Sequence, residues 1–99
     1  MEAPDLWVAN DDGTEIIRAS EIAAVVLDYD GNVTARLVGH DSVVVTLVAH
    51  RTHHDEQRPG DLHRQLLRVM AQLGDSSAAH LVRPVHDETR GWEWVSEPL

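Results

Sequence analysis

The sequence predicts an α+β domain: an antiparallel β-meander sheet of about five to seven strands, open or curled, with one amphipathic helix packed on it. Three turn signals in the first half of the chain predict the meander, namely Asp12-Gly13, Asp30-Gly31 and Gly39-His40. A segment with helical spacing of its apolar residues follows, and two more β-rich segments come after it. The 99 residues suffice for one core, so a single domain over residues 1–99 is expected.

The strands are assigned to segments that are rich in β-branched side chains and bounded by turn residues. Asp30-Gly31 fits a two-residue turn, which would set Val26 opposite Ala35. Pro84 has no amide hydrogen to donate, so the strand that contains it is expected at a sheet edge. The expected strands span residues 5–10, 14–18, 22–29, 32–38, 41–49, 79–86 and 91–96.

A helix is expected over residues 61–73. Asp61 fits the N-cap position, where its carboxylate would accept hydrogen bonds from free backbone N–H groups. His63 lies within the apolar arc of this helix, so we expect a packed, hydrogen-bonded histidine there and not a metal ligand. The apolar side chains that should face the sheet are Leu62, Leu66, Val69, Met70 and Leu73.

The strand over residues 41–49 poses a packing problem, because both of its faces are apolar. Val45 and Leu47 point one way, and Val44 and Val48 point the other. One helix covers only one face of a sheet, so the second face needs another cover. Barrel closure, the C-terminal tryptophan strand and a second subunit remain open. Val44 and Val48 are therefore candidate binding residues.

Trp92 and Trp94 are the other candidate binding residues. They share one face of their strand, with Glu93 on the opposite face. If exposed, the two rings would anchor a partner or stack on a planar ligand. Burial in the core or an interface is the favoured interpretation, because the chain has no Phe and one Tyr to supply large rings.

Histidines and carboxylates are the candidates for metal or acid–base groups. His50, His53 and His54 have side chains suitable for zinc, but no second ligand cluster with a recognised spacing accompanies them. A solvated polar loop is the favoured interpretation, and no metal or cofactor is expected. Turn chemistry accounts for the clustered carboxylates without catalysis; these are Asp11, Asp12, Asp28, Asp30 and Asp41.

The net charge limits the partners. The chain has 17 acidic residues against eight basic ones, giving a formal charge of −9, so nucleic acids and anionic membranes should be repelled. It has no cysteine and therefore no disulfide or thiolate metal site. All eight basic residues are arginines, a usage typical of bacterial genomes rich in G and C. Residues 1–5 lack the features of a signal peptide, so a cytoplasmic protein is expected.

These observations favour a non-enzymatic interaction or accessory module, either a homodimer or a binder of another protein. The alternative is a small-molecule-binding domain with its pocket between helix and sheet, and Trp92 or Trp94 as a wall. No convergent catalytic set is present in the sequence, so an enzyme is not expected.

The seven histidines predict a loss of solubility, or stronger self-association, as the pH falls from about 7.5 to 5.5. Protonation of all seven would change the formal net charge from −9 to −2 and remove most of the repulsion between molecules. Light scattering across this window measures the effect. A variant with glutamine in place of His50, His53 and His54 keeps more negative charge and should scatter less. Flat scattering of the wild type would contradict the prediction.

Overall fold

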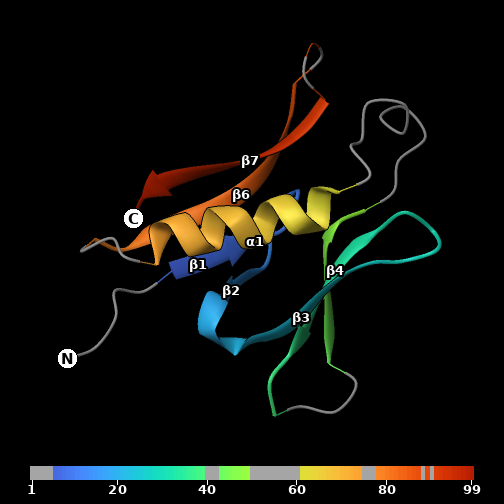
Figure 1. Ribbon diagram of the computed structural model, residues 1–99, viewed down its shortest axis with the longest axis horizontal. Helices are drawn as coiled ribbons and strands as arrows, with labels where there is room; N and C mark the ends of the chain where they lie inside the picture. The colour runs from blue at the N-terminus through green and yellow to red at the C-terminus, as the bar shows by residue number, and fades with distance from the viewer. Residues whose placement is uncertain (1–5, 40–42, 50–60, 75–77, 88, 90) are drawn as a thin grey trace.

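The computed structural model describes residues 6–39, 43–49, 61–74, 78–87, 89 and 91–99. These residues form seven strands and one α-helix, an α+β fold as the sequence predicts (Figure 1). The strands do not continue in one meander. They divide into two mostly antiparallel sheets, and neither sheet closes into a barrel.

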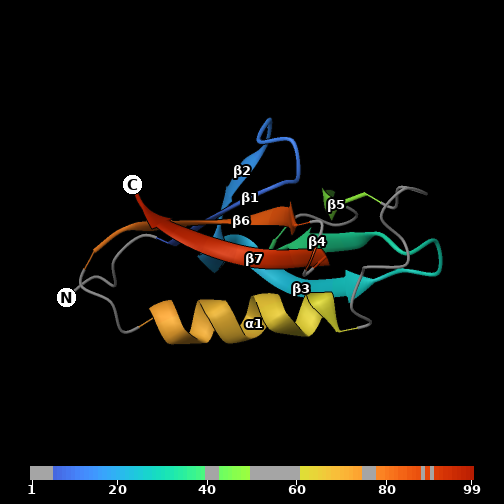
Figure 2. The ribbon, with the colours of Figure 1, turned by 90° about the horizontal axis from the view of Figure 1, so that it is seen from above.

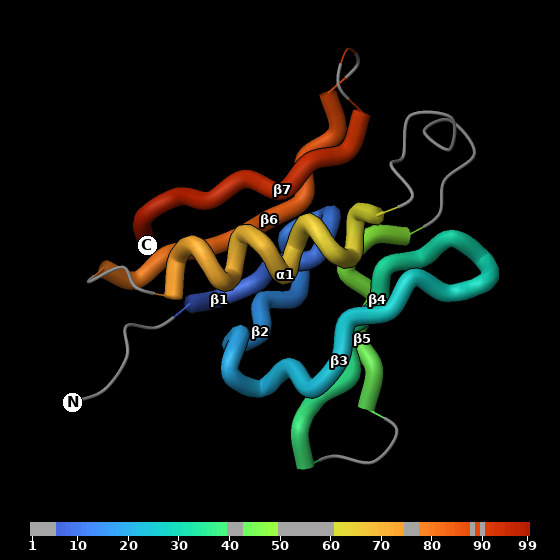
Figure 3. The backbone as a smooth tube through the Cα atoms, viewed as in Figure 1, coloured from blue at the N-terminus to red at the C-terminus, as the bar shows by residue number. Residues whose placement is uncertain are grey.

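The first sheet joins the two ends of the chain. Its strand order is β2-β1-β6-β7, where β1 is Leu6–Ala9, β2 is Ile16–Arg18, β6 is His80–Asp87 and β7 is Gly91–Pro98. Two antiparallel hairpins, β1–β2 and β6–β7, meet where β1 runs parallel to β6. Figure 3 shows this N-terminal strand beside β6, which lies far along the chain. A short 3-10 helix, η1 (Ala19–Glu21), leads from β2 to the second sheet.

The second sheet is a three-stranded meander. Strand β4 (Val33–Leu37) lies between β3 (Ile22–Leu27) and β5 (Val44–Val48), and both pairings are antiparallel. This part of the chain confirms the expected hairpin succession. Residues 40–42, which include part of the expected Gly39-His40 turn, lie outside the described residues.

The register of the β3–β4 hairpin differs by one residue from the expected one. Val26 lies opposite Thr34 and not opposite Ala35. The Asp28 N–H donates to the Asn32 carbonyl at 2.9 Å, so the loop has three residues instead of two. Gly31 ends the loop with a φ of 86°, a left-handed conformation typical of a type I turn followed by a bulge. Because side chains alternate along a strand, this shift changes which residues meet across the hairpin.

The expected edge position of the strand with Pro84 is wrong. β6 is an interior strand, paired with both β1 and β7. Its parallel pairing with β1 ends at Val82, opposite Val8. Pro84 comes after this point and is paired only with Trp94 of β7. The proline therefore needs no second strand partner, and this explains how an interior strand tolerates it.

Helix α1 (Leu62–Leu73) packs against both sheets. It contacts β6 and β7 of the first sheet and β3 of the second. Figure 2 shows it as a separate layer on one side of the strands. Leu62 and Leu66 are fully buried, and Val69, Met70 and Leu73 pack on the core, as the apolar stripe predicts. The buried core is shared by the helix and both sheets; it consists of Val8, Val33, Ala35, Val45, Leu47, Val48, Leu62, Leu66, Val82, Trp92 and Trp94.

Asp61 stands at the N-cap, but its carboxylate makes no capping hydrogen bond to the backbone. The side-chain Nε2 of Gln65 donates to Asp61 Oδ1 at 3.0 Å, and an Arg68 nitrogen lies 3.8 Å from Oδ2. The expected side-chain cap is therefore wrong. The carboxylate instead contacts side chains on the exposed face of the first two turns, where such pairs contribute little to stability.

A contact from the β1–β2 loop ties the two sheets together. The Asp11 N–H donates to the Leu47 carbonyl at 2.7 Å, and the Ala49 N–H donates to Asp11 Oδ2 at 3.0 Å. Leu47 lies near the end of β5, in the other sheet, and Ala49 follows this strand directly. Asp11 therefore links the two sheets and is not only a turn residue.

Truncation of the helix core should destabilise the protein strongly. Leu66→Ala removes a fully buried side chain, so we expect the free energy of unfolding to fall by about 2–5 kcal/mol. Arg68→Ala, on the exposed face of the same helix, should change it by no more than about 0.5 kcal/mol. Urea unfolding followed by circular dichroism measures both. Equal losses in the two variants would contradict the packing of α1.

Candidate interaction surface

Trp92 and Trp94 belong to the core. Their exposed fractions are 7% and 8%, and the Trp94 Nε1–H donates to the Leu62 carbonyl of α1 at 2.9 Å. Trp92 meets the ring of His86 edge to face, with the centroids 5.4 Å apart. The Trp94 ring thus lies between β7 and the helix, with its polar atom satisfied. This arrangement corresponds to the burial in the core that the sequence favours. In the alternative, a tryptophan would form the wall of a ligand pocket between helix and sheet, but the Trp94 ring itself fills that space.

Val44 and Val48 do not share a face, contrary to expectation. Val44 is 52% exposed, whereas Val48 is fully buried. The register of the β4–β5 pair shifts between Val33 and Thr34, which pair with Val48 and Thr46. Leu47 is the extra residue of this bulge, so both Leu47 and Val48 reach the core. No pattern in the sequence marks the bulge, and simple alternation put Val48 on the wrong side.

The histidine candidates His50, His53 and His54 lie outside the described residues. In the part of the chain that the structure describes, no three His, Asp or Glu side chains are placed to hold a metal ion. His63 is half-buried beside the apolar stripe, as expected. Its Nδ1 is buried, but no hydrogen-bond partner for it occurs among the described residues. At Nδ1, therefore, the described residues do not supply the hydrogen bond expected for His63.

Turn chemistry is confirmed for two of the clustered carboxylates. Asp12 Oδ1 accepts from the N–H and the hydroxyl of Thr14 at 3.1 and 2.6 Å. Asp28 Oδ1 accepts from the N–H groups of Asp30 and Asn32, both at 2.9 Å. Asp41 is outside the described residues.

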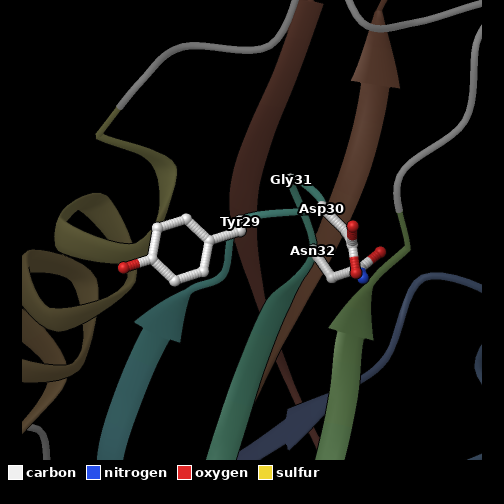
Figure 4. Close-up of a pocket in the computed structure, with 4 residues that line it drawn as sticks. All are labelled: Tyr29, Asp30, Gly31 and Asn32. Atoms are coloured by element: carbon white, nitrogen blue, oxygen red, sulfur yellow. The ribbon is translucent and has the colours of Figure 1, made fainter.

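The Asp28 turn forms an open depression at the tip of the β3–β4 hairpin. Figure 4 shows its lining, with the Tyr29 ring on one side and the Asp30 and Asn32 side chains on the other. Tyr29 is fully exposed, and no described contact holds its ring in a position to bind a ligand. Asn32 donates to Asp28 through both its backbone and its side chain. The depression is therefore a by-product of a tight turn and not a pocket with converging polar groups.

A second hollow, of about 250 Å³, lies where the β1–β2 loop approaches β6. The polar side chains around it are already occupied. The Asn10 side chain binds the Glu15 N–H and the Thr14 hydroxyl, and Arg83 pairs with Glu97 at 2.6 Å. A ligand would have to displace these contacts, so this hollow is a weak candidate for small-molecule binding.

The outer faces of the two sheets differ in their polar cover. On the first sheet, Arg18 lies over the Trp7 ring, with its Cζ 5.0 Å from the centroid. The Arg83–Glu97 pair crosses β6 and β7 on that same side. Long arginine side chains thus cover apolar area while their charged heads reach water. This face is adapted to solvent.

The outer face of the second sheet has no comparable cover among the described residues. Two rows of side chains cross it, defined by the registers of β3, β4 and β5. One row is Val26, Thr34 and Thr46, and the other is Ala24, Arg36 and Val44. Val26 is 37% exposed and Val44 is 52% exposed, and neither row contains a carboxylate.

We call these six side chains the outer β3-β4-β5 face. Val38, which is also exposed, continues this face just beyond the end of β4. Sequence alternation identified Val44 on this face but missed Arg36, whose position depends on the register of two hairpins. On a chain of net charge −9, these six side chains include one arginine and no carboxylate.

Comparison of the chain with protein-family models, with curated proteins and with solved structures finds no match. No helix among the described residues is long and apolar enough to cross a membrane. The functional inference therefore depends on the geometry of the chain itself, and the outer β3-β4-β5 face is its most specific surface feature.

Protonation of Asp28 should weaken the β3–β4 hairpin in acid. The Asn32 N–H, above all, holds the pKa of Asp28 below its ordinary value of 3.8. A lowered pKa in the folded state means that the carboxylate stabilises the fold above pH 3.8, and that this contribution is lost as the pH falls through the folded-state pKa.

Asp28→Asn keeps an acceptor oxygen but no charge, so it should be less stable than the wild type near neutral pH. The difference should shrink as the pH falls below about 4. Urea unfolding at a series of pH values measures it. Asp30→Asn is the matched control, because no described hydrogen bond uses the Asp30 carboxylate. A difference between wild type and Asp28→Asn that does not depend on pH would contradict the role of the charge.

Proposed function

We propose that this chain is a non-enzymatic interaction module that associates with a second copy of itself through the sheet β3-β4-β5. The observation that supports this proposal most strongly is the outer β3-β4-β5 face, with Val44 and Val26 exposed. The described residues offer no converging set of acid, base and nucleophile that would favour an enzyme instead.

Burial of exposed valines supplies the driving force for association. Apolar area removed from water contributes about 25 cal/mol per Å², and the exposed valines of this sheet lie close together. Val44 and Val26 are on the outer β3-β4-β5 face, and Val38 continues it beyond the end of β4. A second copy that contacts this sheet would remove part of this apolar area from water, above all at Val44 on the edge strand β5.

Charge favours this surface over the rest of the molecule. Two copies with a net charge of −9 each repel one another wherever carboxylates meet. None of the six side chains of the outer β3-β4-β5 face is a carboxylate, so this face carries less of that repulsion. The first sheet, by contrast, carries the Arg83–Glu97 pair, which would have to be desolvated.

The substitution Val44→Lys should abolish self-association. The new ammonium group would stand beside Arg36, the cross-strand neighbour of position 44, and place several like charges in the contact between two copies. Sedimentation velocity over a concentration series should show association of the wild type and a monomer for Val44→Lys. The monomer is expected even though the substitution lowers the repulsive net charge of the whole chain.

Ile16→Lys is the matched control. Ile16 is 52% exposed, as is Val44, and it lies on the edge strand β2 of the other sheet. The net charge changes equally in both variants, so Ile16→Lys should associate at least as strongly as the wild type. A wild type that stays monomeric at high micromolar concentration, or equal loss of association in both variants, would disprove the proposed function.

A further inference from the structure

The edge of β5 that faces away from β4 carries backbone groups with which no described residue pairs. In an antiparallel ladder, successive residues point their N–H and C=O groups alternately to the two sides. The Leu37 N–H donates to the Val43 carbonyl, and Ala35 lies opposite Val45, so Val43 and Val45 face β4. The backbone groups of Val44 and Thr46 therefore point away from the sheet.

No described residue pairs with these outward groups. The Asp11 link occupies the neighbouring stretch, at Leu47 and Ala49, and the residue before that stretch is Thr46. The open edge is thus three residues long, from Val44 to Thr46. It contains no charged side chain, no proline and no bulge of its own.

The other sheet edges carry features that discourage pairing with another chain. β2 ends in the charged residue Arg18. β7 carries Glu93 and Glu97 and ends in Pro98. β3 has an irregular register between Ile22 and Ala24. Charges, prolines and bulges are usual means by which natural sheets protect their edges, and β5 has none of these between Val44 and Thr46.

We infer that β5 pairs antiparallel with β5 of a second copy, about a two-fold axis at Val45. This inference deepens the proposed function, on which it rests, by naming the partner strand and its register. Val44 of one copy lies opposite Thr46 of the other, and these two residues exchange both backbone hydrogen bonds. The axis repeats the pair, so four hydrogen bonds join two three-stranded sheets into one of six strands. Because each copy uses the same surface, the contact closes as a dimer and does not propagate.

The charges are compatible with this arrangement. The two outer β3-β4-β5 faces become continuous, and the row Ala24–Arg36–Val44 continues into Thr46, Thr34 and Val26 of the second copy. The two Arg36 side chains are three inter-strand spacings apart, about 14 Å, which exceeds the screening length at physiological salt. Val44 meets Thr46 instead, an uncharged pair of β-branched side chains that suits a sheet.

The size of the contact predicts a weak dimer. Stable interfaces bury at least about 1,200 Å² of surface in total, and one strand edge with its outer side chains supplies less. We therefore expect a dissociation constant of about 100 μM, so that association is detectable at high micromolar concentration. The association would strengthen wherever the local concentration of the chain is raised.

Single cysteines test the register, because the native chain contains none. Residues that exchange backbone hydrogen bonds have Cα atoms about 5.5 Å apart, within the reach of a disulfide, whereas the diagonal pair of Val44 with its own copy is about 7–8 Å apart. Val44→Cys mixed with Thr46→Cys should therefore cross-link about tenfold more than either variant alone under mild oxidation. Isotope labelling of one variant lets mass spectrometry separate the mixed disulfide from the two symmetric ones.

Val44→Cys mixed with Ile16→Cys, whose native residues are equally exposed, measures random collision. Preferential formation of the mixed disulfide between Val44→Cys and Thr46→Cys supports the β5 pairing. If the wild type self-associates in sedimentation but Val44→Cys links mainly to its own kind, or the three disulfides form in random ratio, the strand pairing is overturned and the proposed function stands. If the wild type does not self-associate at all, both fail.

Discussion

The fold depends on one helix that packs against two sheets which share no strand. Leu62 and Leu66 are fully buried, and the Trp94 indole donates to the Leu62 carbonyl, so the first turn of α1 is fixed to β7. The same helix contacts β3 in the second sheet. A three-stranded sheet with one solvated face buries too little on its own, and the helix joins its inner face to the core of the other sheet.

The bulge in the five-residue strand β5 determines which of its side chains are buried and which are exposed. Because Leu47 is inserted, Val45, Leu47 and Val48 all reach the core, whereas Val44 and Thr46 remain outside. Asp11 then secures the end of the strand. The strand thus resolves the problem of two apolar faces by turning one additional residue inward.

Element types and the amphipathic stripe of α1 could be predicted from the sequence, because both depend on local periodicity. Registers could not. The Asp30-Gly31 signal fits both a two-residue and a three-residue loop, and only the Asp28–Asn32 hydrogen bond of the folded hairpin distinguishes them. The surface residues were less predictable still, since they depend on several registers at once. Nothing local marks Leu47 as a bulge, and the position of Pro84 in an interior strand depends on where β1 ends. Long-range pairing decides each of these features, and single-sequence patterns do not report it.

The parallel pairing of β1 with β6 has a consequence for the order of folding. The meander β3-β4-β5 consists of contacts between near neighbours in the chain, which close quickly. β1, by contrast, meets its partner only at residues 80–82, after the helix segment has been made. During synthesis the first strand stays without this partner, and Val8 stays unburied, while the meander and helix form. Completion of the domain is then a slow, late event that the last hairpin brings about.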